Sequence, residues 1–187
     1  MASLPTYLCP TEDPTRLKSI LQGYRLNPRT ILSVVGGLPW PVFFADLYPQ
    51  AQVFSFDNNP AQINLFGDEI SGRTRNTPQL VDVRNSETFR SLLSRTMPGL
   101  LYLSNITNYL LGLDPRGLAK IIYSENIPYI LISAMTQAVR RSGFNPNGTA
   151  SFLRELSING YSYDSYHNPQ SDAFIKTFHF AWQDFNP

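Results

Sequence analysis

The chain has 187 residues, of which 42% are hydrophobic and 16% are charged, and its net charge is +1. This balance excludes an intrinsically disordered chain, and the near-neutral charge gives no reason to expect a nucleic-acid partner. The single cysteine excludes an internal disulfide and a four-cysteine zinc site, and no apolar run is long enough for a membrane span.

These properties predict one domain over residues 1–187, acting in a reducing cytoplasm. Short apolar runs alternate with helical segments along its first hundred residues. The run ILSVV at 31–35 is continuous, as expected for a strand that is buried on both faces. After a leading helix over 14–24, we expect strands over 31–35, 52–56 and 80–83, and helices over 41–48, 60–70 and 86–96. Ser86 is the expected N-cap of the last of these helices.

The second half continues the alternation and then changes character. We expect strands over 99–103 and 129–133, helices over 115–125 and 149–159, and two final strands over 161–166 and 174–182. Strand–helix alternation predicts an α/β fold with a mostly parallel sheet and helices on both faces. The last two strands alternate polar and apolar residues, which predicts a C-terminal antiparallel hairpin in a seven-stranded sheet.

The predicted strand ends carry the residues that suggest a binding site. Gly36 and Gly37 follow the first strand, where the absence of a Cβ lets the backbone approach a ligand. Asp57 ends the second strand about twenty residues later, at the position where such sheets bind a ribose. After the third strand, the Asp82 side chain would accept the adenine amino group while the Val83 backbone meets the ring. The third glycine of the dinucleotide fingerprint is missing, which argues against a nicotinamide cofactor.

The terminal hairpin is similar to the ending of class I S-adenosylmethionine (AdoMet) enzymes. This resemblance implies their Rossmann-like methyltransferase sandwich, with AdoMet bound at the ends of the first strands. The segment FDNNPAQ at 56–62 also resembles the D-x-N-P-x-Q signature of the betaine-lipid synthase group, which are AdoMet 3-amino-3-carboxypropyltransferases. The stretch LSNI at 103–106 looks like a second motif of that group.

The betaine-lipid resemblance implies roles for the matching residues. Asp57 would bind the ribose, and Asn58 and Asn59 belong to the cofactor-binding turn beside it. Ser104 and Asn105 would face the methionine part of AdoMet, because a hydroxyl and an amide can bind an ammonium–carboxylate pair without adding charge.

Tyr109 follows Asn105 by one helical turn, and its ring could contact the sulfonium through its π face. No catalytic residue is assigned, because AdoMet is already activated and the protein mainly positions it. The only two histidines, His167 and His179, lie apart in the closing strands, so no metal site is expected.

The sequence therefore predicts an AdoMet-dependent transferase that moves a methyl or a 3-amino-3-carboxypropyl group to a small-molecule or lipid-like acceptor. Two alternatives stay open at this point. One is a lyase that cleaves AdoMet to methylthioadenosine without an acceptor, and the other is a non-catalytic Rossmann-like binding module. The apolar residues of the last strand also suggest a homo-oligomer paired through the sheet edge.

Overall fold

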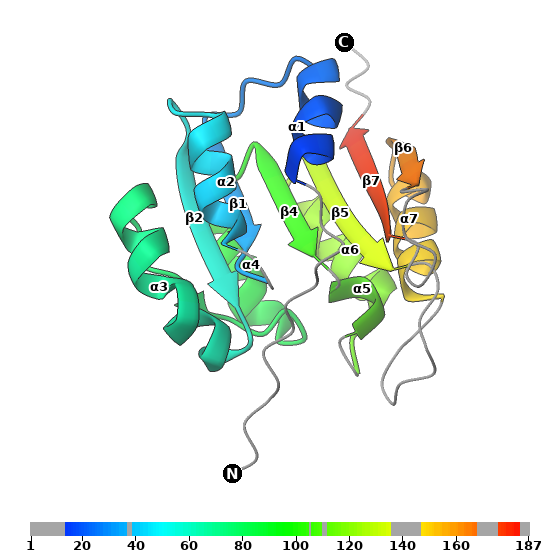
Figure 1. Ribbon diagram of the computed structural model, residues 1–187. Coiled ribbons are helices and arrows are strands. Elements are labelled where there is room, and N and C mark those ends of the chain that lie inside the picture. The colour runs from blue at the N-terminus through cyan, green and yellow to red at the C-terminus, as the bar shows by residue number, and fades with distance from the viewer. Residues whose placement is uncertain are drawn as a thin grey trace.

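A mixed β-sheet lies between two layers of helices (Figure 1). The computed structural model describes residues 14–36, 39–104, 106–109, 112–135, 147–167 and 176–183. The sheet has seven strands in the order β3-β2-β1-β4-β5-β7-β6. Its strands are β1 (Thr30–Val34), β2 (Gln52–Asp57), β3 (Gln79–Leu80), β4 (Leu100–Ser104), β5 (Tyr129–Met135), β6 (Tyr161–His167) and β7 (Lys176–Gln183).

The strand directions confirm the sheet expected from the sequence. Strands β3, β2, β1, β4 and β5 run parallel, so their carboxyl ends share one edge of the sheet. Strand β7 is antiparallel both to β5 and to β6, which makes the final two strands a hairpin with β7 on the inside. From β1 the chain moves outward to β2 and β3 on one side, then returns to β4 beside β1 and fills the other side with the remaining strands.

The helices cover both faces, as Figure 1 shows: α1, α2 and α3 lie on the near face, and α4, α6 and α7 lie behind the sheet. Their bounds are α1 (Pro14–Gly23), α2 (Trp40–Leu47), α3 (Pro60–Thr74), α4 (Ser86–Thr96), α5 (Ile106–Tyr109), α6 (Pro115–Ser124) and α7 (Gly148–Ile158). None of these described helices is long and apolar enough to cross a membrane.

Local chemistry explains most helix starts and corrects one expectation. Pro60 and Pro115 open their helices at the first turn, where the missing N–H costs nothing. The N-cap of α4 is Asn85 rather than Ser86, because the Asn85 side chain accepts a hydrogen bond from the Thr88 N–H at 3.1 Å. The short helix α5 was not expected as a separate element.

Two elements differ in length from the sequence prediction. Helix α3 continues to Thr74 and ends where Arg75 adopts a left-handed conformation with φ of 61°. Strand β3 has only two residues, because the chain turns immediately after it. The Asp82 carboxylate accepts the Arg84 N–H at 2.9 Å, and this local turn competes with further strand pairing.

The apolar strands form the core. The residues of β4 are all buried, as are those of β1 after its first residue, as predicted for strands covered on both faces. On the near face, Tyr102 packs against Trp40 and Phe44 of α2, with ring centroids 5.4 and 5.3 Å apart. This aromatic contact places the start of α2 over the middle of the sheet.

Helix α1 is fastened to the C-terminal hairpin by Tyr24. The Tyr24 hydroxyl lies 2.5 Å from Asp164 Oδ2 and 2.5 Å from the Tyr166 hydroxyl, so it donates to the carboxylate and accepts from the second tyrosine. Its ring packs on Phe180 with centroids 4.0 Å apart. Burial raises the pKa of Tyr24, and the bond to Asp164 raises it further, so the hydroxyl stays protonated as a donor.

We expect Tyr24→Phe to lower the free energy of unfolding by about 1 kcal/mol, because it removes the donor to Asp164 but keeps the ring. Urea denaturation measures this change. Tyr163→Phe is the control, since Tyr163 belongs to the same hairpin but is 40% exposed. Equal stability of the Tyr24 variant and the wild type would show that the hydroxyl does not hold α1 in place.

Candidate functional site

Polar side chains form a row across the carboxyl ends of the parallel strands. The strand register, carried one residue past the end of β1, aligns Asp57, Val35, Ser104 and Ser133 on β2, β1, β4 and β5. Side chains aligned in this way point to the same face of a sheet. Asp57, Ser104 and Ser133 therefore share the face that α2 and α3 cover.

Asp57 is bonded directly to the turn after β1. Its Oδ2 accepts a hydrogen bond from the Gly36 N–H at 3.0 Å, and its Oδ1 accepts one from the Asn59 N–H at 2.9 Å. The Asn59 side chain in turn accepts from the Ala61 N–H and caps α3. The structure thus brings together Asp57, Gly36 and Asn59, which the sequence analysis assigned to one site.

Burial decides the electrostatics of Asp57, because the residue is only 5% exposed. Desolvation raises the pKa of its carboxyl, while the backbone N–H groups of Gly36, Asn59 and Asn58 act in the opposite direction. The carboxylate is therefore a poorly hydrated acceptor that the protein has oriented in advance.

Gly36 adopts a conformation that other residues rarely take. Its φ is 66°, and a Cβ built there would lie 3.4 Å from Trp40 Cδ1 and 3.7 Å from Ser104 Cβ. These are ordinary van der Waals distances, so the positive φ, and not a lack of space, is what favours glycine between Asp57 and Ser104. Gly37 lies outside the described residues.

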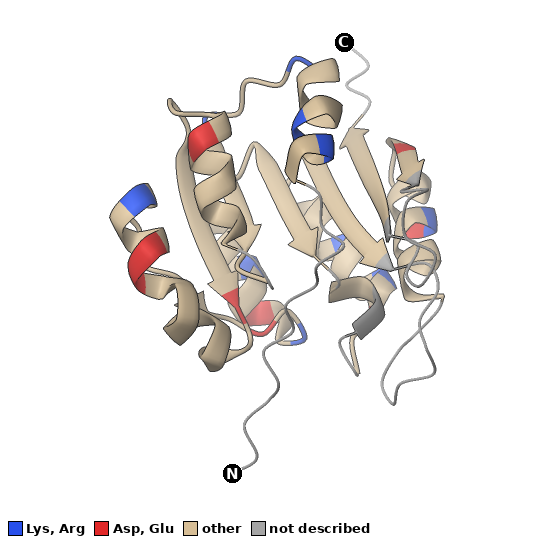
Figure 2. Cartoon of the chain, in the orientation of Figure 1, with Lys and Arg blue, Asp and Glu red and all other residues tan. Residues whose placement is uncertain are grey.

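The second predicted acid is already engaged. The Asp82 carboxylate binds the Arg84 guanidinium, with Nε 2.9 Å from Oδ2, and this pairing lowers the pKa of Asp82. An adenine amino group would have to share this carboxylate with Arg84. Val83 is buried. The loop that carries Asp82 and Val83 begins beside β2, where the Val81 N–H donates to the Asp57 carbonyl oxygen at 2.9 Å. Figure 2 shows acidic residues at this carboxyl end of β2.

The remaining predicted residues are placed less completely. Ser104 ends β4 and is 8% exposed, and Asn58 is exposed beside Asp57. Tyr109 is the last residue of α5, but its side chain and all of Asn105 lie outside the described part of the chain. The hydroxyls of Thr107 and Thr149 lie 2.8 Å apart and tie α5 to α7.

Ser133 is a candidate that the sequence analysis missed. It is fully buried and lies directly beside Ser104 in the register of β4 and β5. The signal was present in the sequence, because the apolar runs at 100–104 and 129–133 both end in serine. A polar residue that closes an otherwise apolar strand is worth assigning to the ligand edge of a parallel sheet.

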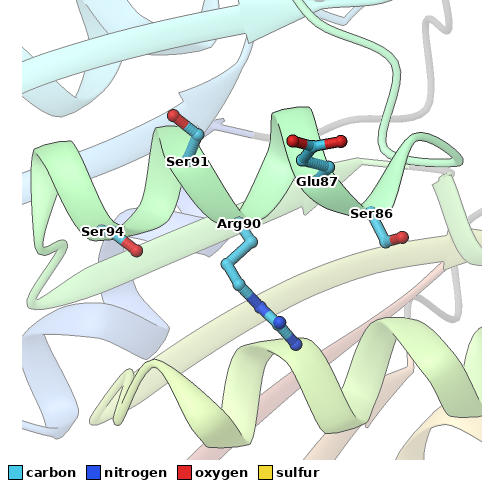
Figure 3. Close-up of a pocket in the computed structure, with 5 residues that line it drawn as sticks. All are labelled: Ser86, Glu87, Arg90, Ser91 and Ser94. Carbon is cyan, nitrogen blue, oxygen red and sulfur yellow. The ribbon is translucent and has the colours of Figure 1, made fainter.

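A surface depression on α4 lies apart from this row of residues. It is lined by Ser86, Glu87, Arg90, Ser91 and Ser94, and Figure 3 shows the Arg90 side chain extending toward the neighbouring helix. Arg90 Nε lies 3.5 Å from Glu125 Oε1, and the Ser94 hydroxyl donates to Glu125 Oε2 at 2.6 Å. These contacts join α4 to the end of α6, so we interpret the depression as part of a helix–helix seam.

The fold of the chain is similar to that of solved methyltransferases. Precorrin-6y C5,15-methyltransferase from Geobacter metallireducens matches with a TM-score of 0.62 and 13% identity, over 90% of this chain and 88% of the other. Magnesium protoporphyrin IX methyltransferase from Synechocystis, with bound SAH, matches at 0.67 and 9% identity over 91% and 81%. The N-methyltransferase NodS from Bradyrhizobium japonicum matches at 0.62 and 15% identity over 92% and 98%.

No protein-family model and no curated protein matches the sequence significantly. At identities of 9% to 15%, the structural likeness shows a shared fold alone. It confirms the fold implied by the terminal hairpin, a Rossmann-like sandwich of the class I AdoMet-dependent methyltransferase type. The resemblance of residues 56–62 to betaine-lipid synthases stays a prediction.

We expect Gly36→Ala to lower the free energy of unfolding by about 1 kcal/mol, because an L-residue in the left-handed region is strained. Thermal unfolding followed by circular dichroism measures the change. Gly23→Ala is the control, since Gly23 ends α1 with ordinary backbone angles and open space around its Cβ position. If Gly36→Ala were as stable as Gly23→Ala, the turn would not need a glycine.

Proposed function

We propose that this chain, which has the class I AdoMet-dependent methyltransferase fold, is an AdoMet-dependent transferase with methyl transfer as its reaction. The observation that carries the proposal is the hydrogen bond from the Gly36 N–H to the buried Asp57 carboxylate. It joins a glycine turn to an oriented acceptor at the edge where such sheets bind nucleosides. Residues 1–187 would act as one AdoMet-binding domain in the cytoplasm.

The residues at this edge suit the chemical groups of AdoMet. Asp57 offers a carboxylate to the ribose hydroxyls, and Gly36, with its φ of 66°, turns the chain beside this carboxylate without a side chain. Ser104 and Ser133 add hydroxyls farther along the row for the methionine ammonium and carboxylate. Val83 would lie beside the adenine ring, and Asp82 would accept the amino group if it shares its bond with Arg84.

AdoMet, when bound, supplies an activated sulfonium whose methyl group is open to attack by an acceptor. The contribution of the protein is then to orient the ligand and keep water away. Burial of Asp57 serves this role, because an acceptor that is poorly hydrated makes a stronger hydrogen bond. The described residues assign no general base, so the acceptor brings its own nucleophile or uses residues outside the described part.

The neighbours support methyl transfer to a small molecule. Two of those reported above are named for precorrin-6y and magnesium protoporphyrin IX, and the third is an N-methyltransferase. The motif at 56–62 supports a second candidate, transfer of the 3-amino-3-carboxypropyl group, because it resembles enzymes with that reaction. Both reactions use the same binding residues and differ in the carbon that the acceptor attacks.

We expect isothermal titration calorimetry to show AdoMet binding that Asp57→Ala weakens at least about tenfold, a loss equivalent to one charge-assisted hydrogen bond. Wild-type affinity should fall as the pH is lowered toward about 4. The reason is that burial raises the pKa of the Asp57 carboxyl, so it protonates at a higher pH than an exposed aspartate and an acceptor is lost. Asp68→Ala, at an exposed residue of α3, is the control that should bind normally.

The product identifies the reaction. We expect mass spectrometry of the protein with AdoMet and a cell extract to detect S-adenosylhomocysteine, the product of methyl transfer. Methylthioadenosine that forms only with extract would instead support aminocarboxypropyl transfer, and methylthioadenosine without any acceptor would identify a lyase. If AdoMet bound and was never consumed, the chain would be a binding module and the proposed reaction would be wrong.

A further inference from the structure

The backbone already uses part of the hydrogen-bonding capacity of Asp57. An ionised carboxylate has about four acceptor sites on its two oxygens. The N–H groups of Gly36 and Asn59 each bind one of these oxygens, at 3.0 and 2.9 Å. A ribose brings two hydroxyl donors, so a second acceptor near Asp57 would let each hydroxyl bind a separate group.

Gln62 has the properties of that second acceptor. Its side chain lies on the buried face of α3, together with Ile70, and the residue is only 5% exposed. Its Oε1 atom is fully buried and has no hydrogen-bond partner among the described residues. An unsatisfied buried amide oxygen destabilises the protein, and a bound donor would remove this cost.

The chain path places Gln62 close to the site. Strand β2 ends at Asp57, and α3 begins three residues later at Pro60, so Gln62 lies in the first turn of the helix. The Asn59 N–H that binds Asp57 belongs to the residue that caps this turn. Helices α2 and α3 lie side by side on the near face, and both begin at the edge that holds Gly36 and Asp57 (Figure 1).

We propose that the Gln62 amide oxygen accepts a hydrogen bond from one ribose hydroxyl while Asp57 accepts one from the other. This inference rests on the proposed function, because it assigns a further binding residue to the same nucleoside site. It also predicts specificity: a ligand that lacks the hydroxyl bound by Gln62 leaves the amide oxygen unsatisfied and binds weakly.

A structural role for Gln62 makes a different prediction. Ser55 Oγ, on the neighbouring strand β2, is also buried and has no hydrogen-bond partner among the described residues. An internal water that joins Ser55 to Gln62 would satisfy both groups without a ligand. In that case, removal of the Gln62 amide would destabilise the ligand-free protein and would not depend on the ribose hydroxyls.

The test compares Gln62→Leu and Gln62→Met with Gln183→Leu, using S-adenosylhomocysteine and its 2′-deoxy and 3′-deoxy analogues. Gln183 is the matched control, because its Oε1 is also buried and has no hydrogen-bond partner among the described residues. It lies at the end of β7, which is antiparallel to β5, so it is level with the amino ends of the parallel strands and away from the candidate site. We expect calorimetry to show about tenfold weaker binding of S-adenosylhomocysteine by both Gln62 variants. Binding by Gln183→Leu should be normal.

The deoxy analogue that lacks the hydroxyl bound by Gln62 should bind the wild type about tenfold more weakly than S-adenosylhomocysteine does. Its affinity should be the same for the wild type and for the Gln62 variants. The ligand-free Gln62 variants should melt no lower than the wild type. Normal binding by these variants, or an equal loss for all three ligands, would overturn the inference, as would a lower melting temperature with unchanged affinity. Failure of the wild type to bind S-adenosylhomocysteine would instead overturn the proposed function itself.

Discussion

The hydrogen bond between the Gly36 N–H and the Asp57 carboxylate is the contact on which the site depends. It joins the turn after β1 to the end of β2, and the second carboxylate oxygen binds the Asn59 N–H at the start of α3. One buried side chain therefore positions two strand ends and a helix. Its ionised form is disfavoured by burial, so it destabilises the folded state at neutral pH, and this effect disappears as the pH falls through the raised pKa. Such a residue is better explained by binding than by stability.

Stability and the candidate function occupy different parts of the sheet. Tyr24 fastens α1 to the hairpin through Asp164 and Tyr166, away from the carboxyl ends of the parallel strands. The polar row of Asp57, Ser104 and Ser133 lies at those ends, and buried polar side chains also occur elsewhere in the sheet, at Ser33, Ser55 and Thr177. Buried polar groups of this kind reduce folding stability unless they are satisfied. At the carboxyl ends three of them stand in one row across β2, β4 and β5.

Much of the fold could be predicted because local patterns carry it. Continuous apolar runs identified β1, β4 and β5, and alternating residues identified the closing hairpin. The errors concern short-range competition at element ends. Three features differ from the prediction: Asn85 rather than Ser86 is the N-cap of α4, β3 ends early, and α3 extends to Thr74. Each depends on which backbone group a nearby side chain or turn satisfies. Composition and periodicity do not resolve such choices.

The sequence by itself determined the order of the elements and placed Gly36 and Asp57 at consecutive strand ends, because parallel strands joined by helices bring their carboxyl ends to one edge. Only the tertiary structure decided which side chains meet there. Ser133 joined the row through the register of β4 and β5, and Gln62 was buried with its amide oxygen unsatisfied among the described residues. The physical reason is that register, helix rotation and burial depend on contacts between distant segments, which no local pattern of residues specifies.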